Sequence, residues 1–324
     1  MVMALCYNFV NTPSDFLGRL PIYKPMLTRR MFLRGAGGAL VMGTALSTYA
    51  IGIEPNFRLS VPQWGVAHAS WPATMPPLRI AVVTDIHAVE PWMSAARIAR
   101  IVETANGLGA DLIVLLGDFV EAMPDFRTGT VSIADWAAEL GRLRAPLGVF
   151  SVLGNHDWYE DVTGVRAGLR QVGIPVLENK AVKIDKAGRR FWLAGLGDQL
   201  ALRKRRGHGG VDDLPGTMRQ TMGDSDPVVL LAHEPDIFVD VPRRVAVTLA
   251  GHTHGGQVRL PLIGRPIVPS GFGQRFAYGH IVEGGRNMIV CAGLGLTGIP
   301  VRFGVPPEIA LVTVGAPGSV EASV

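Results

Sequence analysis

The sequence is organised by short apolar runs, rich in β-branched residues, each of which ends in a polar cluster. The runs occupy residues 78–84, 112–116, 149–153, 228–232, 245–250, 288–291 and 309–314. Their lengths and composition are typical of buried strands. Apolar stripes at helical spacing lie between them, over 98–108 and 136–143. This alternation predicts an α/β layered domain.

Five of these runs lead into Asp, Asn or His. The clusters are Asp85-Ile86-His87, Gly117-Asp118, Gly154-Asn155-His156-Asp157, His233 and Gly251-His252-Thr253-His254. They contain five of the eight histidines in the chain. Ligands of open α/β sheets bind just outside the carboxyl ends of the strands, where neighbouring loops converge. We therefore expect these polar side chains to meet in one site.

Each cluster alone has a structural interpretation, because Asp and Asn often cap helices and Gly-Asp often forms a turn. Their joint occurrence at five strand ends is hard to explain by structural need. Together they supply carboxylates, one carboxamide and several imidazoles, without a thiolate. Such a donor set suits Mn, Fe, Zn, Ni or Co and argues against Cu(I) or a structural zinc finger. A carboxylate that bridges two such ions holds them about 3.5–4 Å apart, as in two-metal hydrolases.

The five clusters resemble the signature of the calcineurin-like metallophosphoesterases, over residues 78–314. The resemblance implies a four-layer α/β/β/α sandwich of two mixed β-sheets, with a dinuclear site at the carboxyl ends of the strands. It implies two divalent ions, with Mn, Fe or Zn expected. The ligands would be Asp85, His87, Asp118 and His254 for one ion, and Asp118, Asn155, His233 and His252 for the other, with Asp118 bridging.

The resemblance also implies the catalytic residues. His156 would lie beside the scissile phosphate, where it can stabilise charge or protonate the leaving oxygen. Asp157 is expected to orient the His156 ring. The sequence gives no role to Glu121, which follows Asp118 by three residues.

Substrate contacts are suggested by a cationic stretch at residues 203–208. Arg203, Arg205 and Arg206 either belong to a solvated loop or hold an anionic headgroup or membrane phosphate. Gln257, shortly after His254, is a further candidate for a substrate contact. The expected activity is a phosphodiesterase or phosphomonoesterase on a phosphoester, which can be lipid-linked. The alternatives are a hydrolase of a UDP-2,3-diacylglucosamine-type pyrophosphate or phospholipid headgroup, and a non-catalytic metal-binding protein of the envelope.

The N-terminal region resembles a twin-arginine export signal. Arg29 and Arg30 precede Phe32-Leu33, and residues 35–53 carry no charge. The resemblance implies passage through the twin-arginine translocase to the periplasm or cell envelope, with 35–53 either removed or kept as an anchor that associates with the membrane. Together with residues 251–261, the leader resembles the exported, cell-envelope branch of the family.

The predicted domain organisation follows from these segments. We expect an N-terminal extension with a signal or anchor over 1–50, with Met26 as a possible start, then a linker over 51–77. The catalytic domain covers 78–314 and a tail covers 315–324. Five of the 31 Lys and Arg residues but only one of the 27 acidic residues lie in 1–50, so the formal net charge of +4 belongs to the leader. A neutral folded part argues against nucleic acid as a partner.

Overall fold

The computed structural model describes residues 28–126, 128–205 and 207–321. The chain divides into two units after Ala45, and the described residues of each unit are treated by themselves. The helix α1 (Arg29–Thr48) covers the described part of the first unit and has no buried residue. The helical segment Arg29–Phe57 is long and apolar enough to cross a membrane, a test that an N-terminal signal sequence also meets. The predicted extension before residue 28 lies outside the described residues.

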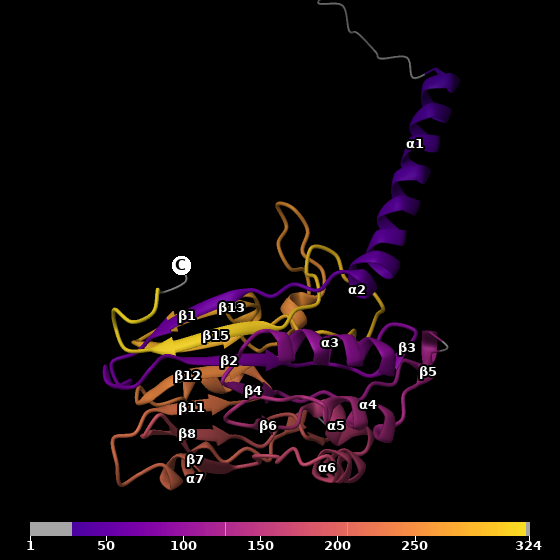
Figure 1. The fold of residues 1–324 in the computed structure, drawn as a ribbon. Coiled ribbons are helices and arrows are strands. Elements are labelled where there is room, and N and C mark those ends of the chain that lie inside the picture. The colour runs from indigo at the N-terminus through magenta and orange to yellow at the C-terminus, as the bar shows by residue number, and fades with distance from the viewer. Residues whose placement is uncertain (1–27, 127, 206, 322–324) are drawn as a thin grey trace, which may run out of the picture. The chain divides into compact units, whose positions relative to one another are not determined.

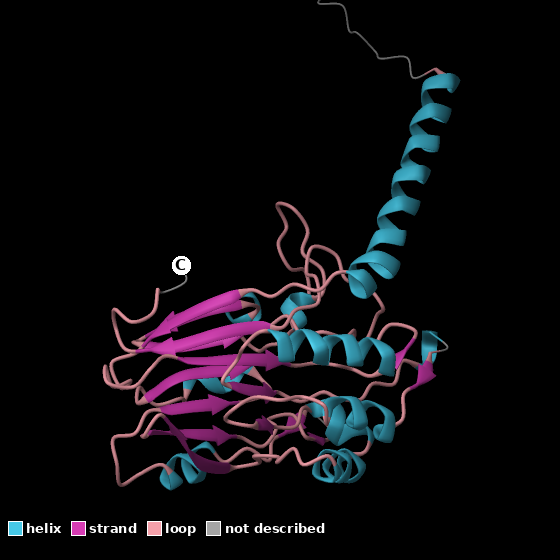
Figure 2. Ribbon diagram, viewed as in Figure 1, coloured by secondary structure: helices cyan, strands magenta, loops and turns pink. Residues whose placement is uncertain are grey.

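The second unit contains two mixed sheets (Figures 1 and 2). The strand order of the first sheet is β1 (Gln63–Ala67), β15 (Ala310–Gly315), β2 (Leu78–Val83), β4 (Leu112–Leu115) and β6 (Val149–Ser151). The order of the second is β13 (Gly279–Glu283), β14 (Arg286–Val290), β12 (Val245–Ala250), β11 (Val228–Leu231), β8 (Arg189–Gly195) and β7 (Lys180–Lys186). The central strands β2, β4 and β6, and likewise β8, β11, β12 and β14, run parallel. Their carboxyl ends therefore meet at one edge of each sheet.

A buried apolar cluster lies between the two sheets. Ile80 and Val114 of the first sheet belong to the same cluster as Leu193, Val229 and Leu249 of the second. All five side chains are fully buried. Burying apolar area of this kind contributes about 25 cal/mol per Å², so this shared interface fixes the two sheets against each other.

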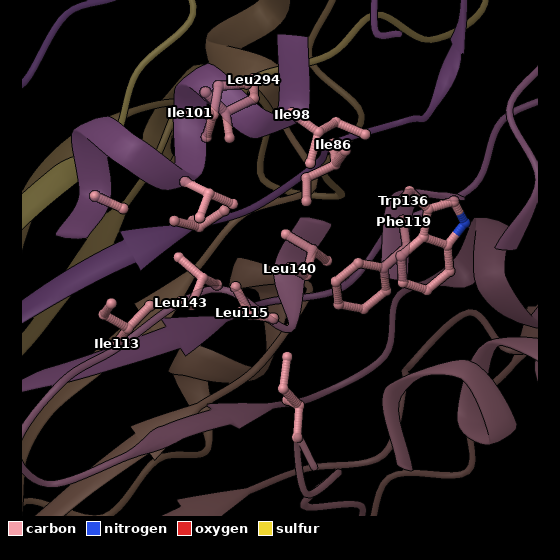
Figure 3. Close-up of a cluster of buried hydrophobic side chains, with 14 of the residues drawn as sticks. Ile86, Ile98, Ile101, Ile113, Leu115, Phe119, Trp136, Leu140, Leu143 and Leu294 are labelled. Atoms are coloured by element: carbon pink, nitrogen blue, oxygen red, sulfur yellow. The ribbon is translucent and has the colours of Figure 1, made fainter. Parts of the chain in front are cut away.

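Helices cover the other face of each sheet. The first sheet packs against α3 (Ala95–Gly107), α4 (Ile133–Leu140) and α6 (Val162–Gln171). Figure 3 shows this cluster, in which the rings of Phe119 and Trp136 stack 5.2 Å apart. The second sheet packs against α7 (Leu214–Gln220) and the 3-10 turn η3 (Pro235–Val239).

Short elements complete the second unit. The remaining helical segments are η1 (Tyr49–Ile53), α2 (Glu54–Phe57), η2 (Pro124–Phe126), α5 (Asn155–Glu160), η4 (His254–Gly256) and η5 (Gly273–Phe276). The remaining strands form two small pairs, β3 (Val89–Glu90) with β5 (Gly129–Thr130) and β9 (Leu202–Arg203) with β10 (His208–Gly209).

All seven predicted runs contain a strand, and both predicted stripes lie on helices, α3 and α4. The segment 51–77 differs from the linker predicted for it, because β1 pairs in parallel with β15 at the edge of the first sheet. The edge strand β7 was also not predicted, since its residues alternate with lysine and aspartate and most of them remain half-buried.

Candidate dinuclear metal centre

The structure brings the seven predicted metal ligands together at the carboxyl ends of strands from both sheets. The first sheet carries Asp85, His87, Asp118 and Asn155, and the second carries His233, His252 and His254. Six of them fall into two groups, within which the ligand atoms lie no more than 4.8 Å apart. The groups are Asp85, His87 and His254, and Asp118, His233 and His252.

In the first group, two imidazole nitrogens face each other. The Nε2 atoms of His87 and His254 are 2.9 Å apart, and His254 Nε2 is 3.5 Å from Asp85 Oδ1. The Thr84 hydroxyl donates to the other Asp85 oxygen, Oδ2. All three ligand side chains are buried. Three converging donor atoms without solvent contact form a preorganised cation site.

The second group contains Asp118, which also lies beside a histidine of the first group. Asp118 Oδ2 is 3.1 Å from His233 Nε2 and 3.4 Å from His87 Nε2. His252 Nδ1 lies 3.3 Å from His233 Nε2. One carboxylate oxygen therefore faces histidines of both groups, which is the placement that a bridging ligand requires.

Asn155 supplies an independent sign that a ligand belongs here. Its Oδ1 atom is buried and has no hydrogen-bond partner in the structure. A buried amide oxygen without a partner costs about 1–3 kcal/mol, and a cation at this position would remove that cost. Asn155 begins α5, and Gly154 before it lies in the short loop after β6.

The backbone at the site is held in an uncommon conformation. Asp85, His87, Asp118, His252 and His254 all have φ between +44° and +67°. Such values are unfavourable for residues with a Cβ atom and occur mainly at functional sites. Five of the seven predicted ligands share this feature, so the fold sustains local strain in order to aim them.

Polar contacts of the second ring nitrogen fix the orientation of two imidazoles. His233 Nδ1 donates to the Leu116 carbonyl oxygen at 2.7 Å, which leaves Nε2 free to bind a cation. His87 Nδ1 lies 3.0 Å from Glu121 Oε2. Glu121 is therefore a functional residue that sequence reasoning missed. Its only sequence indication is its position three residues after Asp118.

The electrostatics of the centre favour positive charge. Burial lowers the pKa of His87, but the Glu121 hydrogen bond and the carboxylate charges outweigh it and raise the pKa to about 9. Burial works against the Asp118 anion, yet His233 and His156 hold the pKa of that carboxyl well below its usual range. Burial and the neighbouring His233 lower the pKa of His252 to about 4, so this ring stays neutral. The buried carboxylates thus hold a proton on His87, and two divalent cations would supply the positive charge in place of such protons.

Two further buried carboxyl groups lie next to His233. Asp198 and Glu234 are both buried, and each has an oxygen within 4.8 Å of a His233 nitrogen. Burial and the charge of Glu234 raise the pKa of Asp198 to about 10. Sequence reasoning did not identify Asp198, because it follows β8, a strand that the sequence did not predict.

His156 lies beside the two groups and belongs to neither, although its ring, the His87 ring and the Glu121 carboxylate place ligand atoms within 4.8 Å of one another. Its ring packs edge-on against His87, with centroids 4.8 Å apart. Its Nδ1 is 3.5 Å from Glu121 Oε2, and its Nε2 is 3.3 Å from the Thr297 hydroxyl. About a fifth of the side chain is exposed (22%), so this imidazole can reach a bound substrate.

Asp157 does not orient the His156 ring as predicted. Its carboxylate accepts backbone hydrogen bonds from Asp118 and Gly154 on Oδ2 and from Phe119 on Oδ1, at 2.8–2.9 Å. Both oxygens are thereby engaged with the loops that carry ligands. Asp157 is a positioning residue for Asp118, and Glu121 takes the place beside His156.

We expect Asp157→Asn to weaken both the fold and the metal site. The new amide places N–H groups where backbone N–H donors now find an acceptor, which costs about 1–3 kcal/mol in the free energy of unfolding. Loss of such a bracing group lowers metal affinity about 10- to 100-fold. Urea unfolding and metal titration measure the two effects. Asp185→Asn is the control, because Asp185 accepts a backbone bond from Gly188 in an exposed turn. Equal metal affinities in the two variants would contradict the assignment.

A cleft of about 490 Å³ opens onto the second group. Asn155, His252, Tyr159 and His208 are among its lining residues. The Arg203 guanidinium lies over the Tyr159 ring, 4.0 Å from its centre, so it stands at the edge of this cleft. Arg205 is exposed, and Arg206 lies outside the described residues.

The structure gives Gln257 a role in holding a loop of the site. Its amide is occupied on both sides: Oε1 accepts from the Thr297 backbone and Nε2 donates to the Thr297 carbonyl, each at 2.9 Å. Gln257 therefore holds the loop that presents the Thr297 hydroxyl to His156, and it also lines a groove beside the ligand His254.

The fold and this donor set match the class of metal-dependent phosphoester hydrolases. The match to the family model for calcineurin-like phosphoesterases covers residues 78–256. The chain belongs to the calcineurin-like phosphoesterase family and is a metallophosphoesterase, a hydrolase of phosphoric esters.

Several relatives share most of the chain. The metallophosphoesterase YkuE of Bacillus subtilis is 30% identical over 89% of this chain and 97% of its own length. The phosphodiesterase YaeI of Escherichia coli is 29% identical over 89% of this chain and 99% of its own. A transmembrane protein with a metallophosphoesterase domain from Danio rerio is 31% identical over 74% of this chain, which spans about half (53%) of that protein.

Proposed function

We propose that the chain is a phosphodiesterase, with phosphomonoesterase activity on small esters, that uses two divalent ions, with Mn, Fe or Zn preferred. The observation that carries the proposal is the position of Asp118 Oδ2, within 3.4 Å of imidazole nitrogens from both ligand groups. We also infer that the two sheets and their helical coverings form the four-layer α/β/β/α sandwich of the family. The relative YaeI, which is named a phosphodiesterase, supports the choice of diesters.

The bound ions would supply the charge that neutralises phosphoryl oxygens and lowers the pKa of an attacking water. Asp85, His87, Asp118 and His254 would hold one ion, and Asp118, Asn155, His233 and His252 the other. An attacking water would approach phosphorus in line with the ester oxygen that leaves.

The chain's own acid is His156. With a proton on Nε2, the ring can protonate the leaving oxygen. Glu121 Oε2, 3.5 Å from Nδ1, stabilises the doubly protonated ring. The Thr297 hydroxyl, 3.3 Å from Nε2, fixes the direction in which the proton is delivered.

Metal analysis and turnover test the proposal together. Purified protein should contain two equivalents of divalent metal and should hydrolyse bis-p-nitrophenyl phosphate, with activity lost on chelation and restored by Mn or Zn. Two bound metals without turnover would instead support a non-catalytic metal-binding protein. Fewer than two metals in active protein would contradict the dinuclear centre.

We further propose that the protein is exported by the twin-arginine route and acts at the cell envelope. The Arg29-Arg30 pair at the start of α1 and the uncharged stretch 35–53 support this location. Replacing both arginines with lysine should retain the protein in the cytoplasmic fraction. Unchanged export of that variant would contradict the route.

A further inference from the structure

A loop beside the metal centre exposes a large apolar side chain in a strained conformation. Leu260 and Gly264 exchange backbone hydrogen bonds of 2.8 and 3.0 Å, which close a tight turn around Leu262. The Leu262 side chain is fully exposed, and its φ is +66°. Both features disfavour leucine, because the left-handed conformation clashes with Cβ and the apolar surface stays in water. Folding gives no reason for leucine here, so an external apolar partner is indicated.

Neighbouring residues extend this exposed apolar surface. Ile263 and Ile267 are 69% and 73% exposed, and Ile299 on the adjacent loop is 49% exposed. We call Leu262, Ile263, Ile267 and Ile299 the apolar rim. Ile267 and Ile299 line one groove, and Leu262 and Ile263 lie on the same loop as Ile267. Exposed aliphatic side chains gathered on one loop and its neighbour mark a surface for apolar contact.

A groove runs from the apolar rim to the metal centre. It has a volume of about 400 Å³, and Ile267, Ile299 and Val258 line it together with the ligand His254. Thr297, whose hydroxyl faces His156, also lines the groove. A molecule with an apolar chain in this groove therefore has its polar end at the metals.

The charge around the rim is positive. Residues 255–282 contain no Asp or Glu, whereas Arg259 and Arg265 flank the Leu262 turn. Arg259 is exposed, and the Arg265 guanidinium lies 5.1 Å from the centre of the Tyr278 ring. Cations placed beside exposed aliphatic side chains match an anionic lipid surface, where each contributes about 1 kcal/mol.

Residues 49–57, which follow the apolar helix, are bonded to the base of the same loop. Arg302 N donates to the Ala50 carbonyl at 2.9 Å, and Glu54 accepts from the backbone N–H of Val305. Phe303, which follows Arg302, forms backbone hydrogen bonds with Gln257 and Arg259. Figure 1 shows the orange loop after β12 rising from the same edge of this unit as α2. The rim and the end of the candidate membrane segment thus share one end of the domain.

We propose that the apolar rim inserts into the headgroup region of an anionic bilayer, and that the groove takes an acyl chain of a phospholipid whose phosphodiester reaches the metal centre. This rests on the proposed function and names its substrate class. The reaction is hydrolysis: the water oxygen bonds to phosphorus, one P–O ester bond breaks, and the leaving oxygen takes up a proton.

The test compares three substrates with the full-length, Mn-loaded chain. They are phosphatidylglycerol in vesicles of dioleoylphosphatidylglycerol and dioleoylphosphatidylcholine, monomeric dihexanoylphosphatidylglycerol, and bis-p-nitrophenyl phosphate. For Leu262→Glu combined with Ile263→Glu, the ratio of vesicle hydrolysis to bis-p-nitrophenyl phosphate hydrolysis should fall at least tenfold. For Ile267→Asp, the KM for the monomeric lipid should rise at least tenfold relative to that for bis-p-nitrophenyl phosphate.

Two further variants separate lipid contact from folding. Met222→Glu is the matched control, because Met222 is 66% exposed in the turn after α7, and it should change neither ratio. Leu262→Gly relieves the left-handed strain. It should raise Tm while lowering the vesicle ratio, a pair of changes that damage to the fold cannot produce.

The outcomes are distinguishable. Turnover of bis-p-nitrophenyl phosphate without turnover of either lipid overturns the lipid proposal and leaves the proposed function standing. No turnover of any substrate by metal-loaded protein overturns the proposed function itself. A homodimer that Leu262→Glu dissociates in light scattering, with unchanged lipid ratios, assigns the rim to a second copy of the chain and overturns the bilayer contact.

Discussion

The Asp118→Ala variant is expected to bind neither metal ion and to lose phosphoester hydrolysis. Asp118 Oδ2 faces His233 Nε2 at 3.1 Å and His87 Nε2 at 3.4 Å, so one substitution removes the carboxylate that faces both groups. The remaining imidazoles would hold two positive ions without the anion that separates and neutralises them. We expect a loss of at least about 10³-fold in kcat/KM, equivalent to about 4 kcal/mol of transition-state stabilisation.

Metal content by mass spectrometry and kcat/KM for bis-p-nitrophenyl phosphate measure this effect. Asp125→Ala is the control, because Asp125 is an exposed aspartate in the short turn η2, away from the predicted ligand set. It should retain two metals and full activity. An Asp118→Ala protein that keeps both metals at native affinity would refute the bridging role.

His156→Ala, unlike Asp118→Ala, should retain both metals while turnover is lost. The His156 ring is not in either ligand group, yet it is partly exposed beside them. Removing a positioned general acid lowers kcat about 10²- to 10⁴-fold. The KM should change little, because the ring acts on the leaving oxygen as the bond breaks.

The leaving group distinguishes a proton donor from a merely structural residue. An ester with an acidic leaving group, such as p-nitrophenol, needs less help from an acid than an ester of a simple alcohol. The defect of His156→Ala should therefore be larger for the alkyl ester. Equal defects for both esters would make His156 a charge-stabilising residue, and loss of one metal would make it a ligand. His68→Ala, at a half-buried histidine outside the predicted site, is expected to leave metal content and kcat unchanged.

The central strands and the ligand set could be predicted because both are encoded locally. A buried parallel strand is a continuous apolar run, and the residue that ends it necessarily lies at the sheet edge. Asp85, Asp118 and His233 can therefore be identified as candidate ligands from the sequence. The edge strand β1 could not be predicted in this way, because its place beside β15 depends on a pairing with residues almost 250 positions away.

The supporting residues of the site depend on packing that spacing alone does not reveal. Glu121 reaches His87 and His156 only because the chain turns back after Asp118. Asp157 follows His156 directly, which suggested that it serves that ring. The first turn of α5 instead directs its carboxylate towards three backbone N–H groups. Gln257 illustrates the same point, since the loop at Thr297 occupies its amide.

The division of the ligands between two sheets has a mechanical consequence. Asp118 is carried by one sheet and His233 by the other, and the apolar layer between the sheets fixes the distance between them. Cations bound to both would act as a cross-link at one end of that layer. Calorimetry should then record a higher unfolding temperature for loaded than for stripped protein. A large-to-small substitution deep in the layer, such as Leu249→Ala, would change the distance between the ligands carried by the two sheets. Catalysis would then weaken although the substituted residue does not contact the ions.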